Sequence, residues 1–181
     1  PDLAVSELDI AASHGQVDAN IISPHHIDMI IQYLMKQDGE IFRDAILLLC
    51  LCYFSGLRRS EAGYLQLSDF TFSTDLSGPV DMYIRQNVKR GIKSKAARRI
   101  LPLDVLWPAD HLSLLRNKIM YSRQLSVTPT RSLFEDNRKV EKAFLLITDL
   151  MHYVTGDQTL RIHHLRHSFA NWQWRSEERR V

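Results

Sequence analysis

The sequence predicts a mainly α-helical domain with one small antiparallel β-sheet, an α+β fold. Most of the chain carries apolar residues at helical spacing. Two short segments, residues 81–86 and 98–103, depart from this period and are typical of strands, and a basic, glycine-containing stretch joins them. The 181 residues, 45% of them hydrophobic, are enough for a single domain with a proper core.

The amino-terminal half is expected to be helical after a tail. Residues 1–21 lack a clear period and are interpreted as a tail or linker, so the domain is expected to span residues 22–181. Ser23 can cap a first helix, Pro24 suits its first turn, and an apolar stripe follows at Ile27, Ile30, Ile31 and Leu34.

Further elements follow in order. A second, largely buried helix is predicted over residues 41–55, ending at Gly56, and a short third helix over residues 58–67. Beyond the two strands, whose connecting hairpin tip is "NVKRGIKSKAA", the predicted helices cover residues 108–125 and 137–154 and the segment "RIHHLRHSFANW".

The longest apolar run, "AILLLCLCYF" at residues 45–54, is far shorter than the roughly 20 residues of a membrane span. It is interpreted as a buried core helix, and its Cys50 and Cys52 as reduced, buried thiols. No basic-then-apolar leader opens the sequence. We therefore expect a cytoplasmic protein without a membrane partner.

Charge is distributed unevenly, although the net charge is only +2. Residues 1–40 carry seven acidic side chains against Lys36 alone, whereas every charge from residue 85 to residue 99 is positive. Such a segment is typical of an anion-binding surface, although a solvated, lysine-rich loop would look the same. The candidate DNA-binding residues there are Lys89, Arg90, Lys95, Arg98 and Arg99.

Three separate segments could together form a phosphate-binding pocket. "SGLRRSE" places Arg58 just after the sharp turn at Gly56, the hairpin tip offers Lys93, and the final helix carries His163 and Arg166 on one face. Guanidiniums can donate paired hydrogen bonds to phosphate oxygens, and an imidazole can exchange a proton near neutral pH.

These motifs resemble those of the tyrosine recombinases, the phage-integrase family of DNA strand-exchange enzymes. "GLRRSE" is similar to the family's first arginine box, "IKSKAARRILPL" to its lysine-bearing hairpin, and "HHLRHSFA" to its second box. The resemblance covers residues 22–174 and implies the fold of that family's catalytic domain, with double-stranded DNA and further recombinase protomers, in a tetramer, as partners.

The resemblance also implies residue roles and a reaction that needs no cofactor. Arg58 and Arg166 would clamp the scissile phosphate without a metal ion, Lys93 would protonate the departing 5′ oxygen, and His163 would be the second-box histidine. Lys95 competes with Lys93 for its role. Glu61 and His167 would support these groups, although Arg58 could simply pair with Glu61, and His167 could be a core or capping residue.

The family's nucleophilic tyrosine, which forms a 3′-phosphotyrosyl intermediate, follows the second box, but no tyrosine follows Arg166 here. We therefore expect a recombinase catalytic domain that is incomplete at its C-terminus and inactive alone. A catalytically inactive DNA-binding module derived from an integrase is the alternative. A metal hydrolase using His163 and His167 is disfavoured because the zincin pattern requires Glu where His164 stands.

Overall fold

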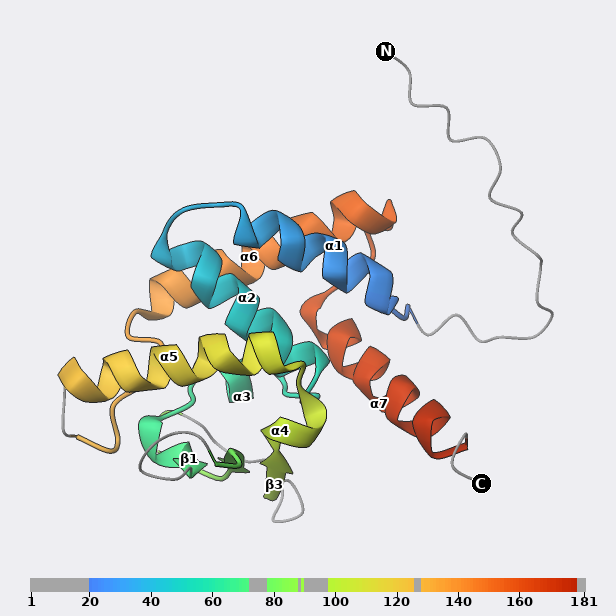
Figure 1. Cartoon of the computed structure of the whole chain (residues 1–181). Helices are drawn as coiled ribbons and strands as arrows, with labels where there is room; N and C mark the ends of the chain where they lie inside the picture. Colours follow the sequence, from blue (N-terminus) through green and yellow to red (C-terminus); the bar gives the residue numbers. More distant parts are fainter. Residues whose placement is uncertain (1–19, 72–77, 88, 90–97, 126–127, 179–181) are drawn as a thin grey trace.

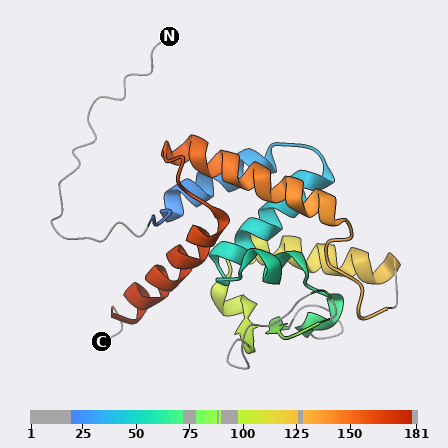
Figure 2. The same cartoon turned by 180° about the vertical axis from the view of Figure 1, so that it is seen from behind.

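The computed structural model describes residues 20–71, 78–87, 89, 98–125 and 128–178, and of residues 173–178 the backbone alone. They form a helical domain with a three-stranded antiparallel sheet at the end opposite α1 and α6 (Figures 1 and 2), which confirms the predicted α+β class. The elements in chain order are α1 (Pro24–Met35), α2 (Glu40–Tyr53), α3 (Arg59–Gly63), the 3-10 helix η1 (Leu67–Asp69), β1 (Phe70–Thr71), β2 (Asp81–Ile84), β3 (Arg99–Pro102), α4 (Leu103–Leu106), α5 (Ala109–Leu125), α6 (Asn137–Thr155) and α7 (Ile162–Glu178).

Helix α1 confirms the predicted cap and stripe. The Ser23 hydroxyl accepts a hydrogen bond from the His26 backbone N–H at 3.3 Å, Pro24 is the first helical residue, and the four predicted stripe residues are buried. Of the predicted tail only Asn20 and Ile21 are described. The predicted domain begins at Ile22, whose backbone N–H donates to the Ser168 hydroxyl of α7 at 2.9 Å. This bond joins the start of the domain to its last helix.

Helix α2 is the centre of the domain, and α1, α3, α5, α6 and α7 all contact it (Figure 1). Residues 44–53 are buried without interruption, as expected for a core helix. Cys50 and Cys52 are both free and buried, and burial raises the pKa of the Cys52 thiol to about 12, so it stays protonated. Within the described part of the chain, no helix combines the length and apolar character needed to cross a bilayer.

The sheet has the order β1-β2-β3, and Ile84 of β2 lies opposite Arg99 of β3. Successive side chains of a strand point to opposite faces. Met82 and Ile84 are buried, whereas Ile100 and Pro102 of β3 are exposed. Arg99 therefore shares the inner face of β3 with Leu101, although it is charged.

Four details of the sequence prediction were wrong. The third helix ends at Gly63 rather than at residue 67, because the chain beyond it pairs with residues 131–133: Leu67 N–H donates to Arg131 O, and Leu133 N–H to Leu65 O. The strand predicted over residues 81–86 ends at Ile84, and the second ends at Pro102, where α4 begins. The sequence also missed β1, η1 and α4, all of them four residues or shorter.

Candidate functional site

The first and second arginine boxes meet at Gly56. This glycine has a φ of +60°, and a Cβ added to it would lie 2.4 Å from Cδ1 of Phe169 in α7. Real Cβ atoms do not approach a ring so closely, and positive φ is strained for other residues. Gly56 is therefore needed both for the turn and for the close approach of α7. The sequence predicted the turn but not the contact.

Arg58 stands at the N-cap position of α3 and interacts with Glu61 one turn later. A Glu61 carboxylate oxygen accepts from the Arg58 backbone N–H at 2.9 Å, and the other accepts from Arg58 Nη1 at 3.2 Å. The simple pairing anticipated from the sequence is therefore present. It leaves the Arg58 side chain nearly half exposed, so the guanidinium remains accessible.

Glu61 binds more than one arginine. Its carboxylate accepts from Arg99 Nη2 at 2.8 Å and Nη1 at 3.3 Å, and Arg166 Nη1 lies 3.7 Å from Oε2. Its side chain is only 7% exposed. Burial alone would raise the pKa of Glu61, but the hydrogen bonds from Arg99 and from the Arg58 backbone, with the charges of both arginines, hold it below its usual value. We call Glu61, Arg58, Arg99 and Arg166 the Glu61 cluster.

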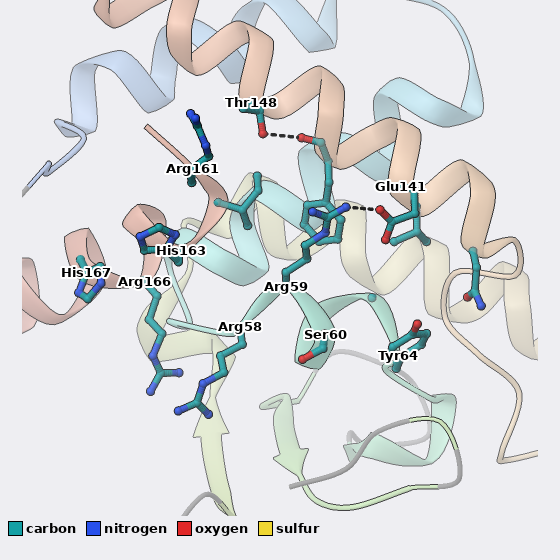
Figure 3. Close-up of a pocket in the computed structure, with 15 residues that line it drawn as sticks. Arg58, Arg59, Ser60, Tyr64, Glu141, Thr148, Arg161, His163, Arg166 and His167 are labelled. Atoms are coloured by element: carbon teal, nitrogen blue, oxygen red, sulfur yellow. Dashed lines mark hydrogen bonds and ion pairs between the residues drawn. The ribbon is translucent and has the colours of Figure 1, made fainter. Parts of the chain in front are cut away.

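Arg166 of α7 is held by the backbone as well. Its Nη1 donates to the carbonyl of Gly56 at 2.6 Å. Burial, and then the positive charges of Arg58 and Arg99, lower the pKa of Arg166, which remains charged because guanidinium titrates far above neutral pH. In Figure 3 the Arg58 and Arg166 side chains extend in the same direction. Three guanidiniums against one carboxylate leave an excess of positive charge at this place.

His163 and His167 of α7 lie beside Arg166 (Figure 3). His163 and His167 are exposed, and their rings meet edge-on at 5.7 Å, so His167 is not a core residue. His164 Nδ1 accepts a hydrogen bond from the Arg161 backbone N–H at 2.9 Å, and this bond caps the N-terminus of α7. Burial, with the neighbouring His163 and His167, lowers the pKa of His164. No group of three or more metal-ligating side chains occurs among the described residues.

Arg58, His163, Arg166 and His167 line one cavity of about 700 Å³. Its walls come from α3, from α6 between Asn137 and Thr148, and from the start of α7. The structure therefore brings together three of the four residues that the sequence nominates as catalytic. An open cavity with this concentration of positive charge can bind a phosphate group through guanidinium N–H donors.

Comparison with known proteins identifies the architecture. No family model and no curated protein matches this sequence. Solved structures with a similar fold include XerH site-specific recombinase bound to difH substrate in a pre-cleavage complex, and XerH bound to palindromic difH substrate in a post-cleavage complex. Each aligns with a TM-score of 0.61 at 20% sequence identity and covers 87% of this chain. This chain has a recombinase fold. It spans 43% of the XerH chain.

The hairpin of this recombinase fold is only partly described. Lys93, Lys95 and Arg90 lie outside the described residues, so their predicted roles stay predictions. Lys89 is exposed and donates to the Ser132 hydroxyl at 3.4 Å. Arg98, the residue just before β3, is also exposed. Arg99, predicted as a DNA-binding residue, instead directs its guanidinium inward to Glu61.

Several cavity residues were missed by the sequence analysis. Arg59 is the second arginine of "GLRRSE", so the doublet could have marked it. Residues of α6 line the same cavity without belonging to any motif, and no sequence signal places them there; they include Asn137, Glu141 and Phe144. Arg161 also lines the cavity, and its Nη1 donates to the carbonyls of Gln158 and Leu160.

Proposed function

We propose that this chain is the phosphate-binding part of a site-specific DNA recombinase that cleaves and rejoins strands through a 3′-phosphotyrosyl intermediate. One observation carries the proposal: Arg58 and Arg166, from segments more than 100 residues apart, converge on one buried carboxylate and line one cavity. The fold shared with XerH supports it. The proposed partners are duplex DNA and further recombinase protomers in a tetramer, in the cytoplasm.

The arginines would act on the scissile phosphate. Each guanidinium can donate to its non-bridging oxygens, and these bonds strengthen as negative charge develops during attack. Glu61 would fix the spacing of the two guanidiniums, because both interact with its carboxylate. An arginine in another phosphoryl-transfer system contributes on the order of 10³–10⁵ in rate, so two such groups are a large part of the needed stabilisation.

The proton steps would use His163 and Lys93. A tyrosine oxygen attacks phosphorus and forms the new P–O bond, and His163 accepts the phenol proton. The bond to the 5′ oxygen breaks, and Lys93 donates the proton that this oxygen requires. Attack by a 5′ hydroxyl of another strand reverses both steps and releases the tyrosine. In the family that the motifs resemble, the tyrosine follows the second box, and residues 167–181 contain none, so in this proposal the nucleophile comes from outside residues 1–181.

The experiment uses a nicked suicide duplex that traps the covalent intermediate. We expect no DNA-linked band on a denaturing gel from residues 1–181 alone. A chain extended by the downstream segment of a related recombinase, or mixed with a protomer that carries this segment, should give the band. A band from residues 1–181 alone would mean that another residue is the nucleophile and would contradict the proposed steps.

The second candidate is a DNA-binding module without catalysis, which would use the same arginines to hold backbone phosphates. The exposed Lys89 and Arg98 are compatible with it, since phosphate contacts give affinity without requiring cleavage. Duplex binding by the extended chain without any covalent band would favour this candidate over the recombinase.

A further inference from the structure

We propose that Arg59 is a second contact for a DNA backbone phosphate, and that the carboxylate of Glu141 occupies this phosphate position while DNA is absent. The inference rests on the proposed function, because it extends the same cavity. It concerns a residue beside Arg58 that the reaction described above does not use.

Arg59 and Arg58 are adjacent in sequence, but their side chains leave in opposite directions. Arg58 extends toward the tip of Arg166, whereas Arg59 extends toward α6 (Figure 3). Both line the same cavity. A DNA strand carries one phosphate for every ~3.4 Å of helix axis. A strand whose scissile phosphate lies between Arg58 and Arg166 would therefore have further phosphates available along the cavity wall.

The Arg59 guanidinium is already held in place by an aromatic ring. Its Cζ lies 5.1 Å from the centroid of Phe144, a side chain that is itself buried and therefore fixed. A ring accepts none of the guanidinium's N–H groups as a carboxylate or phosphate would, so this cation–π contact leaves N–H donors available for an anion. The donor is thus oriented before any ligand arrives.

The anion at that edge is a protein side chain. Arg59 Nη2 donates to the carboxylate of Glu141 on α6. Both side chains are open to solvent, at 47% and 60% exposure, and ion pairs of this kind are weak. Carboxylate and phosphate accept the guanidinium fork in the same geometry. A phosphate can therefore replace Glu141 while the contact with Phe144 persists.

The test is duplex DNA binding by the 181-residue chain, measured by fluorescence anisotropy over a range of salt concentrations. Glu141→Gln should tighten binding several-fold, because Arg59 no longer has a competing anion. The matched control is Glu135→Gln, which removes the same charge from another exposed ion pair, the one with Arg131. Glu135→Gln should tighten duplex binding clearly less than Glu141→Gln does.

Arg59→Gln should weaken binding and lower the slope of log affinity against log salt by about 0.9, the value for one phosphate contact. In the Arg59→Gln background, Glu141→Gln should tighten binding no more than Glu135→Gln does. This dependence on Arg59 separates competition for one site from a general change in charge.

Two results would overturn the inference: equal effects of Glu141→Gln and Glu135→Gln in the wild-type background, or an unchanged salt slope in Arg59→Gln. The outcomes also separate failure of this inference from failure of the proposed function. If the chain binds duplex DNA and the extended chain forms the covalent band, while these variants behave as the control does, only the role of Arg59 is wrong. If neither binding nor the band is seen, the recombinase proposal fails and takes the inference with it.

Discussion

Two ionic clusters among the described residues differ in their balance of charge. In the Glu61 cluster, one buried carboxylate faces three arginines from three elements. In the Lys118 cluster, Lys118 of α5 binds Asp44 at 2.9 Å and Glu40 at 3.3 Å, both on α2, and Lys139 of α6 binds Glu40 at 2.7 Å. The second cluster has as many carboxylates as ammonium groups, whereas the first has surplus positive charge.

The carboxyl groups respond to these surroundings in opposite ways. Burial raises the pKa of Asp44, and the bond from Lys118 opposes this only in part. The arginines outweigh burial at Glu61 and lower its pKa. In the Lys118 cluster the opposite charges balance, which suits its place between helices α2, α5 and α6. A cluster with excess positive charge, open to a cavity, is suited to an incoming anion, and for this reason we propose the Glu61 cluster as the phosphate-binding site.

The largest expected effect is on chemistry at the Glu61 cluster. Arg166→Ala in the extended chain should reduce the rate of covalent adduct formation on the order of 10³-fold or more, because one guanidinium no longer stabilises the developing charge. Loss of the bond to the Gly56 carbonyl should lower the free energy of unfolding by about 1 kcal/mol, which leaves the variant folded under assay conditions. The rate of the adduct band on a denaturing gel is the measurement. An adduct formed at the wild-type rate would remove Arg166 from the active site.

The next effect is on stability, at the Lys118 cluster. Lys118→Met leaves Asp44, whose side chain is 6% exposed, without its ammonium partner and should lower the free energy of unfolding by about 3 kcal/mol. Urea unfolding measures it. Duplex affinity at a temperature where the variant is folded should match the wild type. A marked loss of affinity would show that the Lys118 cluster also belongs to the DNA surface.

Glu61→Gln should affect both adduct formation and stability. At neutral pH we expect a loss of about 2 kcal/mol of stability, between the values typical of exposed and buried pairs. Because the folded-state pKa is lowered, this contribution is complete above the ordinary carboxyl pKa of about 4.3 and is lost as the pH falls through the folded-state value. The difference between variant and wild type should therefore narrow in acid. A constant difference from pH 7 to pH 3 would show that Glu61 is not held ionised by the arginines.

The smallest effect concerns the basic residues at the edge of the sheet. Replacing Lys89 and Arg98 with alanine should flatten the salt dependence of duplex binding by up to about 0.9 per lost phosphate contact, without changing sequence preference. Stability should not change, because both side chains are exposed. An unaltered slope would show that this part of the hairpin lies away from DNA.

The fold could be predicted from sequence where local patterns agree with the tertiary structure. Ser23, Pro24 and the isoleucine stripe define α1 by themselves, and the continuous apolar run defines α2. The end of α3 could not be predicted, because its helical pattern continues to residue 67 while pairing with residues 131–133 takes precedence. Elements as short as β1 and α4 are set by their neighbours and leave little periodic signal.

In the candidate site, too, some residues could be predicted from sequence and others could not. Arg58, His163 and Arg166 belong to motifs and could be nominated from sequence. Arg99 was assigned to the outer surface because it belongs to a basic run, and only the strand register shows that it points inward to Glu61. Glu141 and Phe144 lie on a helix with no motif, and their place beside Arg59 depends on how α6 packs.

The contact between Gly56 and Phe169 limits which side chains these two positions can carry together. A mutation that gives Gly56 any side chain collides with the Phe169 ring, and a smaller residue at 169 would relieve that collision but not the strain of a positive φ. The Gly56 carbonyl is also the acceptor for Arg166. A change at Gly56 would therefore disturb a proposed phosphate ligand. A chimera joining "GLRRSE" from one protein to "HHLRHSFA" from another would have to preserve the fit between Gly56 and Phe169.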